Sequence, residues 1–295
     1  EGGAGTFSDG KLTTRIKDDR VRKVIAELIE AGAPEKIAYE AHPHLGTDRL
    51  VDIVTAVRHK IIRLGGEVRF HERLEGIRMQ NGRLSAVLSS NEDIPADCLI
   101  LCIGHSARDT YEKLYAQQVF LEQKEFAVGA RAEHPQILID RNQYGRFCGH
   151  PRLEPAEYHL THTAASGRGV YTFCMCPGGI VIPSASEPET IVVNGMSYSA
   201  RNGKSANSAI LVQVSRSDFD HGDPFDGFRF QHELEARAWQ LAKGPQAPAQ
   251  NITGFLRNET GRSLVQDSSY PLGTCLRNLR DLFPPEINHA MADGL

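Results

Sequence analysis

One apolar stretch, residues 97–104, constrains the fold of this chain most. Its sequence, Asp-Cys-Leu-Ile-Leu-Cys-Ile-Gly, is apolar at its centre without alternating with polar residues. A strand with one solvated face alternates, so this pattern predicts a strand covered on both faces, as in the parallel sheet of an α/β protein. Gly104 ends the strand. Ser106, with Asp109 three residues later, resembles a capping box that opens a helix reaching about residue 117.

The glycine turn after this strand is a candidate ligand site. A parallel strand that feeds a helix presents backbone N–H groups and the positive end of a helix dipole. Open α/β sheets bind ligands at the carboxyl ends of their strands. We therefore take Gly104, His105 and Ser106 as candidate cofactor-binding residues. An ordinary strand-to-helix turn is the alternative.

The residues before this strand predict helices, a short strand and a hairpin. Apolar residues at helical spacing predict a helix over 21–29, and another that begins at Thr47 as N-cap and ends at Gly65-Gly66. Residues 67–70 alternate like a short strand. Asn81-Gly82 lies between two alternating runs. This pair predicts a two-residue hairpin turn, because both turn residues need positive φ.

The pattern changes after about residue 122. Short β-like runs separated by turn-rich segments predict a mainly antiparallel β domain over residues 123–248. The predicted strands are 126–130, 137–139, 158–163, 169–174, 180–183, 191–194 and 210–214. A helix is predicted over 231–243, and a final one starts at Pro285, a residue suited to the first helical position. We expect residues 1–122 and 249–295 to form one domain, into which the β domain is inserted.

Charge and cysteine content narrow the class of protein. The 295 residues include 33 basic and 37 acidic side chains, so the basic excess typical of a nucleic-acid-binding protein is missing. No apolar run approaches the roughly 20 residues of a membrane span. Six cysteines are too few for a disulfide framework, which favours a reducing, cytoplasmic setting, or a plastid in a plant. Cys98 and Cys102 are expected to be buried thiols of the strand.

Several motifs together resemble a known family. They are residues 1–11 (Glu-Gly-Gly-Ala-Gly-Thr-Phe-Ser-Asp-Gly-Lys), 44–49 (His-Leu-Gly-Thr-Asp-Arg), 102–109, 129–135, 173–179 (Phe-Cys-Met-Cys-Pro-Gly-Gly) and 194–197 (Asn-Gly-Met-Ser). This set resembles bacterial and plastid proteins described as FAD-dependent or NAD(FAD)-utilising dehydrogenases. The resemblance implies an α/β fold, in which a Rossmann-like FAD-binding domain carries the inserted β domain. It implies FAD as cofactor, a small-molecule substrate and NAD(P)H as a candidate electron donor.

The sequence departs from that family in one respect. It contains no strand followed by Gly-x-Gly-x-x-Gly and a helix, the turn that holds a pyrophosphate. In the family this turn precedes a stretch like residues 1–5, and a second glycine-rich cofactor segment follows one like residues 291–295. We therefore expect an internal fragment with an incomplete FAD-binding domain, whose own flavin binding is weak or missing.

The resemblance also implies cofactor-binding residues. The first loop would lie against the flavin or its pyrophosphate, because clustered glycines let backbone N–H groups approach an anion. Its candidates are Gly2, Gly3, Ala4, Gly5, Thr6, Ser8, Asp9 and Lys11, and a frayed terminus is the alternative. Gly178 and Gly179 would form a turn that approaches the flavin ring closely. His44 and Thr47 are further candidates on the cofactor side.

Four residues are candidates for catalysis. Cys174 and Cys176 are candidate redox thiols, with packing as the alternative. Arg131 could hold a substrate carboxylate, or pair with Glu133, and His134 could act as acid or base. By resemblance, a polar cluster lines the cleft between the domains: Asn194, Ser197, Arg201 and Asn207.

A different use of the cysteines is metal binding. His159 and His162 with Cys174 and Cys176 supply two imidazoles and two thiols, a set that structural zinc accepts. Their spacing is not that of a common zinc finger. The sequence thus favours an FAD-dependent oxidoreductase of unknown substrate. A zinc-stabilised module, or an FAD-binding module without redox turnover, is the alternative.

Overall fold

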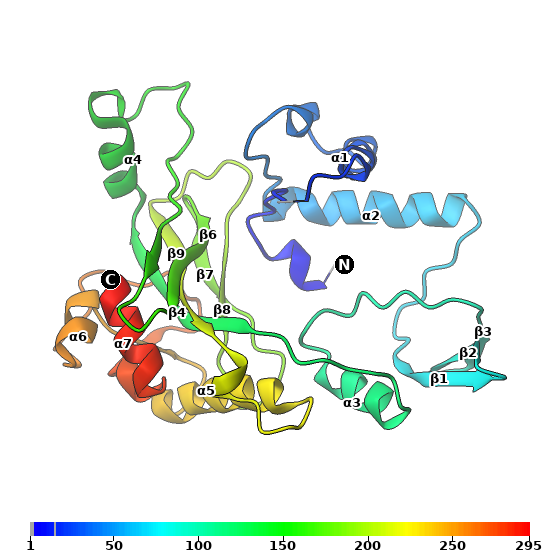
Figure 1. The fold of residues 1–295 in the computed structure, drawn as a ribbon. Coiled ribbons are helices and arrows are strands. Elements are labelled where there is room, and N and C mark those ends of the chain that lie inside the picture. Colours follow the sequence, from blue (N-terminus) through cyan, green and yellow to red (C-terminus); the bar gives the residue numbers. More distant parts are fainter. Residues whose placement is uncertain (1–2, 15) are drawn as a thin grey trace. The chain divides into compact units, whose positions relative to one another are not determined.

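The chain divides into two compact units. A computed structural model describes residues 3–14 and 16–295 (Figure 1). Unit 1 comprises the described residues of 1–60, with 125–215 and 231–295. Unit 2 comprises 61–124 and 216–230. Both units mix helices with antiparallel sheets.

The centre of unit 1 is a four-stranded antiparallel sheet in the order β4-β9-β6-β5. Its strands are β4 (Phe126–Pro135), β9 (Ser205–Val214), β6 (Gly169–Cys176) and β5 (Thr161–Thr163). A separate antiparallel pair joins β7 (Ile180–Pro183) to β8 (Val193–Met196). The predicted antiparallel β region is thereby confirmed. Residues 137–139 are an exception, because they belong to helix α4 (Gln136–Tyr144).

The C-terminal helix packs against this sheet. Val170 and Val212 are opposite one another in β6 and β9, and both are buried. Helix α7 (Pro285–Gly294) contacts these two strands and buries Ile287 and Met291 (Figure 1). Pro285 occupies the start of α7, as predicted.

The N-terminal part of unit 1 has its own small core. Helix α1 (Arg20–Glu30), the 3₁₀ turn η2 (Glu35–Ala38) and helix α2 (Thr47–Arg63) surround it. The buried residues at its centre are Ala33, Ile37, Leu45 and Ile53. Both predicted helices are therefore confirmed. Gly65, with φ 87°, follows the end of α2 and donates its N–H to the Ile62 carbonyl.

Short elements complete unit 1. The remaining helices and 3₁₀ turns are η1 (Gly3–Thr6), η3 (Gly145–Phe147), α6 (Ile252–Arg257) and η5 (Leu279–Asp281). β10 (Ala247–Ala249) and β11 (Thr274–Leu276) form a parallel pair. Helix α5 (Asp226–Ala242) begins five residues before its predicted start and runs from unit 2 into unit 1, and the 3₁₀ turn η4 (Arg216–Asp218) of unit 2 precedes it.

Unit 2 is built on the predicted hairpin. β1 (Leu74–Gln80), β2 (Arg83–Ser89) and β3 (Asp93–Pro95) form an antiparallel sheet. Asn81 and Gly82 have φ values of 52° and 75°, as a type I′ turn requires. Helix α3 (Arg108–Ala116) contacts β1.

Two predicted strands are wrong. Residues 97–104 have no strand conformation, Ile100 is 81% exposed, and Cys98 and Cys102 are exposed rather than buried. A strand needs a neighbour for its backbone hydrogen bonds. Among the described residues no strand pairs with this segment. Residues 67–70 are also irregular. The predicted capping box is wrong too, because α3 begins at Arg108 with Ala107 at the N-cap.

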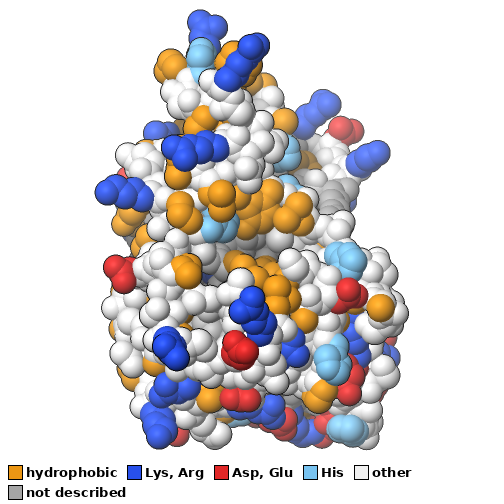
Figure 2. Space-filling view, turned by 90° about the vertical axis from the view of Figure 1, so that its left-hand side faces the viewer, with side chains coloured by type: hydrophobic (Ala, Val, Ile, Leu, Met, Phe, Trp, Pro, Cys, Tyr) orange, Lys and Arg blue, Asp and Glu red, His pale blue; other side chains and the backbone are white. Residues whose placement is uncertain are grey.

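The surface carries mixed apolar and charged groups. On the face shown in Figure 2, hydrophobic side chains gather near the middle, with lysine and arginine side chains above and below them. No helix among the described residues has the length and apolar character needed to cross a membrane.

Candidate functional site

The N-terminal loop and the sheet of unit 1 enclose a cleft of about 1100 Å³, here called the N-terminal cleft. The loop contributes Ser8, Asp9, Gly10, Lys11, Thr13 and Thr14 to its walls, His42 adds an imidazole, and residues 159–163 and 169–174 complete them. Ligand pockets measure about 300–1,000 Å³, so this cleft has room for a large cofactor. The predicted cofactor loop and the predicted redox residue Cys174 therefore share one cleft.

Asp9 fixes the loop that forms one wall. Its carboxylate is 1% exposed and accepts hydrogen bonds from the guanidinium of Arg201, with Nε at 3.1 Å, and from the hydroxyl of Ser197. Arg201 is 5% exposed, so the pair is buried. Two members of the predicted polar cluster, Ser197 and Arg201, thus hold Asp9. Its charge is neutralised inside the protein and positions the loop.

The start of α2 holds the same loop from the other side. The amides of Gly46 and Leu45 donate to the carbonyls of Asp9 and Gly10, both at 3.0 Å. The Thr47 hydroxyl donates to the carbonyl of Thr6, and the Thr47 amide donates to that of Ser197 at 3.1 Å. Thr47 is therefore a positioning residue for the loop.

His44 is buried beside this junction. Its Nε2 lies 3.3 Å from the carbonyl oxygen of Ser199. Its Nδ1 has no hydrogen-bond partner among the described residues.

The first glycines of the loop have free space around their α-carbons. Gly3 and Gly5 lie in η1, and an added Cβ at either would meet nothing within 4 Å. Packing therefore does not explain these glycines. Gly2 lies outside the described residues. Ala4 belongs to the same 3₁₀ turn.

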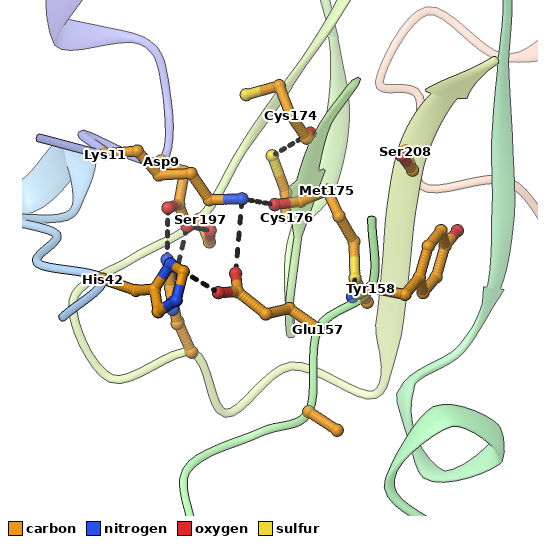
Figure 3. Close-up of polar contacts among 12 residues, drawn as sticks. Asp9, Lys11, His42, Glu157, Tyr158, Cys174, Met175, Cys176, Ser197 and Ser208 are labelled. Atoms are coloured by element: carbon orange, nitrogen blue, oxygen red, sulfur yellow. Dashed lines mark hydrogen bonds and ion pairs between the residues drawn. The ribbon is translucent and has the colours of Figure 1, made fainter. Parts of the chain in front are cut away.

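Lys11 crosses the cleft wall toward the sheet. Its ammonium donates to the carbonyl of Met175 and lies 3.5 Å from Oε2 of Glu157. The other carboxylate oxygen of Glu157 lies 3.8 Å from Nδ1 of His42. Figure 3 shows the three side chains converging from three separate segments. This group places a positive charge at the cleft, with Glu157 beside it.

Cys174 lies in a bulge of β6. The pairing with β9 shifts between Phe173, opposite Ala209, and Cys176, opposite Asn207, so β6 carries one extra residue. Cys174 has φ 47°, in the left-handed region that side chains other than glycine rarely adopt. Such strain concentrates at functional sites.

The two thiols of the bulge differ in acidity. Hydrogen bonding to Cys176, and then the charges of Lys11 and Arg131, lower the pKa of the Cys174 thiol despite its partial burial. Hydrogen bonding to Cys174 and burial raise the pKa of the Cys176 thiol. Cys176 is 0% exposed, and its Sγ donates to the Cys174 carbonyl at 3.4 Å. Of these two cysteines, Cys174 is the one that lines the cleft and whose pKa is lowered.

Arg131 supports the bulge from behind. Its guanidinium donates to the side-chain oxygen of Asn207 at 2.6 Å, to the Cys174 carbonyl at 3.3 Å, and to the side-chain oxygen of Asn194 at 3.4 Å. The alternative Arg131–Glu133 pair is not formed, because Glu133 accepts hydrogen bonds from Ser268 and Ser269. Asn194 and Asn207 of the polar cluster therefore position Arg131.

His134 lies outside the cleft lining. Its Nε2 is 2.9 Å from the hydroxyl oxygen of Tyr158, and the two rings are 5.6 Å apart. Burial raises the pKa of that tyrosine.

Gly178 and Gly179 pack against the chain itself. Both are buried, and Gly178 has φ 59° and donates its N–H to Gln136 at 3.0 Å. An added Cβ at Gly178 would overlap the carbonyl of Arg201, and one at Gly179 would press on the carbonyl of Met196. These glycines approach the protein's own backbone closely, and their predicted approach to a flavin ring stays a prediction.

Gly104, His105 and Ser106 belong to unit 2, where all three are exposed. The hydroxyl of Tyr111 donates to the Gly104 carbonyl at 3.0 Å. They form no part of the N-terminal cleft.

The predicted zinc ligands are not gathered. His159, His162 and Cys174 line the cleft, but His162 Nε2 faces Asp293 at 3.6 Å and Cys176 is buried below the bulge. Among the described residues, the one group of three ligating side chains with atoms within 4.8 Å of one another lies elsewhere.

Sequence reasoning missed Glu157 and the wall residues Thr13 and Thr14. Glu157 stands in an irregular segment, and nothing in its local pattern distinguishes it from a surface acid. The histidines at 42 and 44 were the available signal, since one of them faces Glu157.

Comparison with known proteins gives two findings. The family described as "FAD-dependent protein, C-terminal domain-like" matches residues 125–295, more than half of the chain. An uncharacterised protein of Clostridium beijerinckii is 47% identical over 298 residues, covering 100% of this chain and 56% of the relative. The chain thus spans about half the length of that relative.

Proposed function

The chain belongs to the FAD-dependent protein, C-terminal domain-like family, and from this membership we propose that it functions in an FAD-dependent oxidoreductase. In this proposal residues 1–122 and 249–295 contribute to a Rossmann-like FAD-binding domain, and residues 123–248 shape the substrate side. A small molecule is the substrate, and NAD(P)H is the candidate electron donor.

The N-terminal cleft is the observation that carries the proposal. It has the volume for a flavin, and its loop contributes the hydroxyl groups of Ser8, Thr13 and Thr14 to the lining. Asp9, the buried acid of the lining, is neutralised by Arg201, Lys11 pairs with Glu157, and three imidazoles complete the polar lining. This lining suits an anionic cofactor, since uncompensated carboxylates would repel its phosphates.

The residues of the cleft have distinct roles in this proposal. FAD, when bound, supplies the hydride chemistry. Lys11 offsets negative charge at the cleft wall, and Glu157 and Met175 hold its ammonium in place. Thr13 and Thr14 supply hydroxyl groups that can donate to cofactor oxygens. Cys174 presents a thiol of lowered pKa from the opposite wall.

Flavin titration tests the proposal. Purified chain and the full-length Clostridium relative are each titrated with FAD, with quenching of flavin fluorescence as the readout. We expect saturable binding by the relative and weaker binding by the chain, in which Lys11→Met lowers the affinity for FAD about tenfold through the loss of one charge-assisted contact.

Lys23→Met is the matched control, because Lys23 lies on α1 and pairs with Glu27, outside the cleft lining. Absence of FAD binding by both proteins, or equal affinity in the Lys11 and Lys23 variants, would overturn the proposal. Reduction of the bound flavin by NADH or NADPH in stopped flow then separates an oxidoreductase from a protein that only binds FAD.

A further inference from the structure

A second group of ligating side chains lies on α5 and the loop between β7 and β8. His232 and Glu235 come from the helix, and Glu187 comes from the loop. One ligand atom from each residue lies within 4.8 Å of the other two. None of the three lines the N-terminal cleft.

Helical spacing explains why two of these residues meet. Positions 232 and 235 are three residues apart on α5, so their side chains share one face of the helix. A His-x-x-Glu pair of this kind supplies an imidazole nitrogen and a carboxylate to the same point.

Backbone contacts hold the third residue against that face. The amide of Ile191 donates to the carbonyl of Glu235 at 3.1 Å, which fixes the loop onto α5. The hydroxyl of Thr190, a residue only 5% exposed, donates to the Glu187 carbonyl at 2.7 Å. The first bond ties the loop to α5 and the second fixes the turn from Glu187 to Thr190, so the backbone at Glu187 is held near the helix.

The chemistry of the group suits a cation. Glu187 Oε2 lies 2.6 Å from Nδ1 of His232, and the carboxylate of Glu235 lies beside both. Two carboxylates this close repel one another unless a positive charge lies between them. A protonated histidine supplies one such charge, and a divalent ion supplies two.

We propose that Glu187, His232 and Glu235 bind one divalent transition-metal ion, with water in the remaining positions. One imidazole and two carboxylates are ligands that Zn²⁺ and Mn²⁺ accept. Ligand atoms around a tetrahedral zinc lie about 3.3 Å apart, given bonds of about 2.0–2.1 Å. The present separations of up to 4.8 Å must shorten when an ion binds.

The bound ion joins the β7–β8 loop to α5. The site is also partly open, because the His232 side chain is 49% exposed and that of Glu187 is 27% exposed. Metal can therefore enter from solvent, and a water ligand remains exchangeable.

Mn²⁺ is the sharper probe, because thiolates bind it poorly and the six cysteines contribute little background. Binding to the purified, metal-stripped chain is measured from the loss of the free Mn²⁺ signal in electron paramagnetic resonance, and Zn²⁺ is then used to displace it. We expect one site per chain. Glu187→Gln, His232→Ala and Glu235→Gln should each weaken Mn²⁺ binding about 100-fold, the upper end of the loss that outer-shell substitutions cause.

Glu233→Gln is the matched control, because Glu233 is an exposed acid on the same helix and outside the group. Thermal melts without metal check that each variant folds. Melts with metal give a second readout, since Mn²⁺ should raise the midpoint of the parent chain and of Glu233→Gln but not of the ligand variants. No Mn²⁺ binding by the parent chain, or equal affinity in the ligand variants, would show that the group is only an ion pair.

Discussion

At the scale of the residue, Cys174 carries the most information. Cys174 has a positive φ because it lies in the bulge of β6. The bulge brings its thiol to the cleft near Lys11, and Arg131 donates to its carbonyl. The charges of Lys11 and Arg131 add to the hydrogen bond from Cys176 that lowers the pKa of the Cys174 thiol. Sequence alone identified the pair of cysteines. It could not rank them, since the difference in burial comes from a register shift between β6 and a strand thirty residues away.

The acidity of Cys174 can be measured by alkylation. Because the thiolate reacts, a lowered pKa moves the onset of reaction below the pH of an ordinary thiol, near 8.5. Replacing the hydrogen-bond donor in Cys176→Ala should raise the pKa of Cys174 and shift that onset to higher pH, whereas Cys176→Ser keeps a donor and should shift it less. Iodoacetamide labelling followed by mass spectrometry of the peptide gives the pH profile. Identical profiles in all three proteins would contradict this explanation.

Gly178 tests the close approach behind the bulge. A side chain there meets both a left-handed backbone, at φ 59°, and the carbonyl of Arg201. We expect Gly178→Ala to lower the free energy of unfolding by about 3 kcal/mol. Gly82→Ala shares the positive φ but faces open space, so its cost should be about 1 kcal/mol. Urea unfolding of both variants makes the comparison, and equal losses would mean that the contact adds nothing.

At the scale of the element, the sequence predicted structures that depend on adjacent residues and mispredicted those that depend on distant ones. The hairpin at Asn81-Gly82 and the helices α1, α2 and α7 were predictable, because turn chemistry and apolar spacing are properties of adjacent residues. Residues 97–104 were misread because an apolar run indicates burial only where neighbouring strands exist to cover it. Residues 137–139 were misread because a short apolar run cannot distinguish a strand from a helical turn.

Segment 97–104 should exchange its amide hydrogens quickly. Its amides have no strand partner among the described residues, and Ile100 is 81% exposed. The amides of β9, paired on both sides by β4 and β6, should exchange slowest in the chain. Hydrogen–deuterium exchange of peptides from the two segments measures the contrast. Strong protection of 97–104 would show that it is covered in solution.

The N-terminal loop depends on one buried ion pair. Arg201→Met leaves the Asp9 carboxylate buried without its counter-charge, and breaking such a pair costs about 3–5 kcal/mol. Adding Asp9→Asn removes the stranded charge, so the double variant should be more stable than Arg201→Met alone. Urea unfolding gives both free energies. A double variant that loses the sum of the single losses would argue against coupling between the two residues.

At the scale of the whole molecule, the sequence predicted most residues of the candidate site but not which of them lie in the same cleft. Ser8, Asp9, Lys11 and Cys174 were predicted, and the structure brings them to one cleft. Gly104 to Ser106 were grouped with them and belong to unit 2. Which candidates meet is decided by contacts between segments more than 150 residues apart, such as that of Lys11 with Met175. No local pattern encodes such a contact.

Cofactor binding should also change stability. A ligand that binds only the folded state adds RT ln(1 + [L]/Kd), about 2.7 kcal/mol at a hundredfold excess over Kd. We expect FAD to raise the melting temperature of the full-length Clostridium relative in proportion to log[FAD], while adenosine alone raises it less. Differential scanning fluorimetry without a flavin-sensitive dye measures both. An unchanged midpoint at saturating FAD would contradict a folded-state site.

Unit 1 is assembled from three separate stretches of the chain. Helix α7, which contacts β6 and β9, follows both strands in the sequence. During synthesis at about 5–20 residues per second, β4 leaves the ribosome on the order of ten seconds or more before α7 is made. β6 and β9 are themselves made during that interval, and Val170 and Val212 lack the cover of α7 until it follows. The order of translation therefore leaves this apolar face of the sheet open to a chaperone until α7 packs on it.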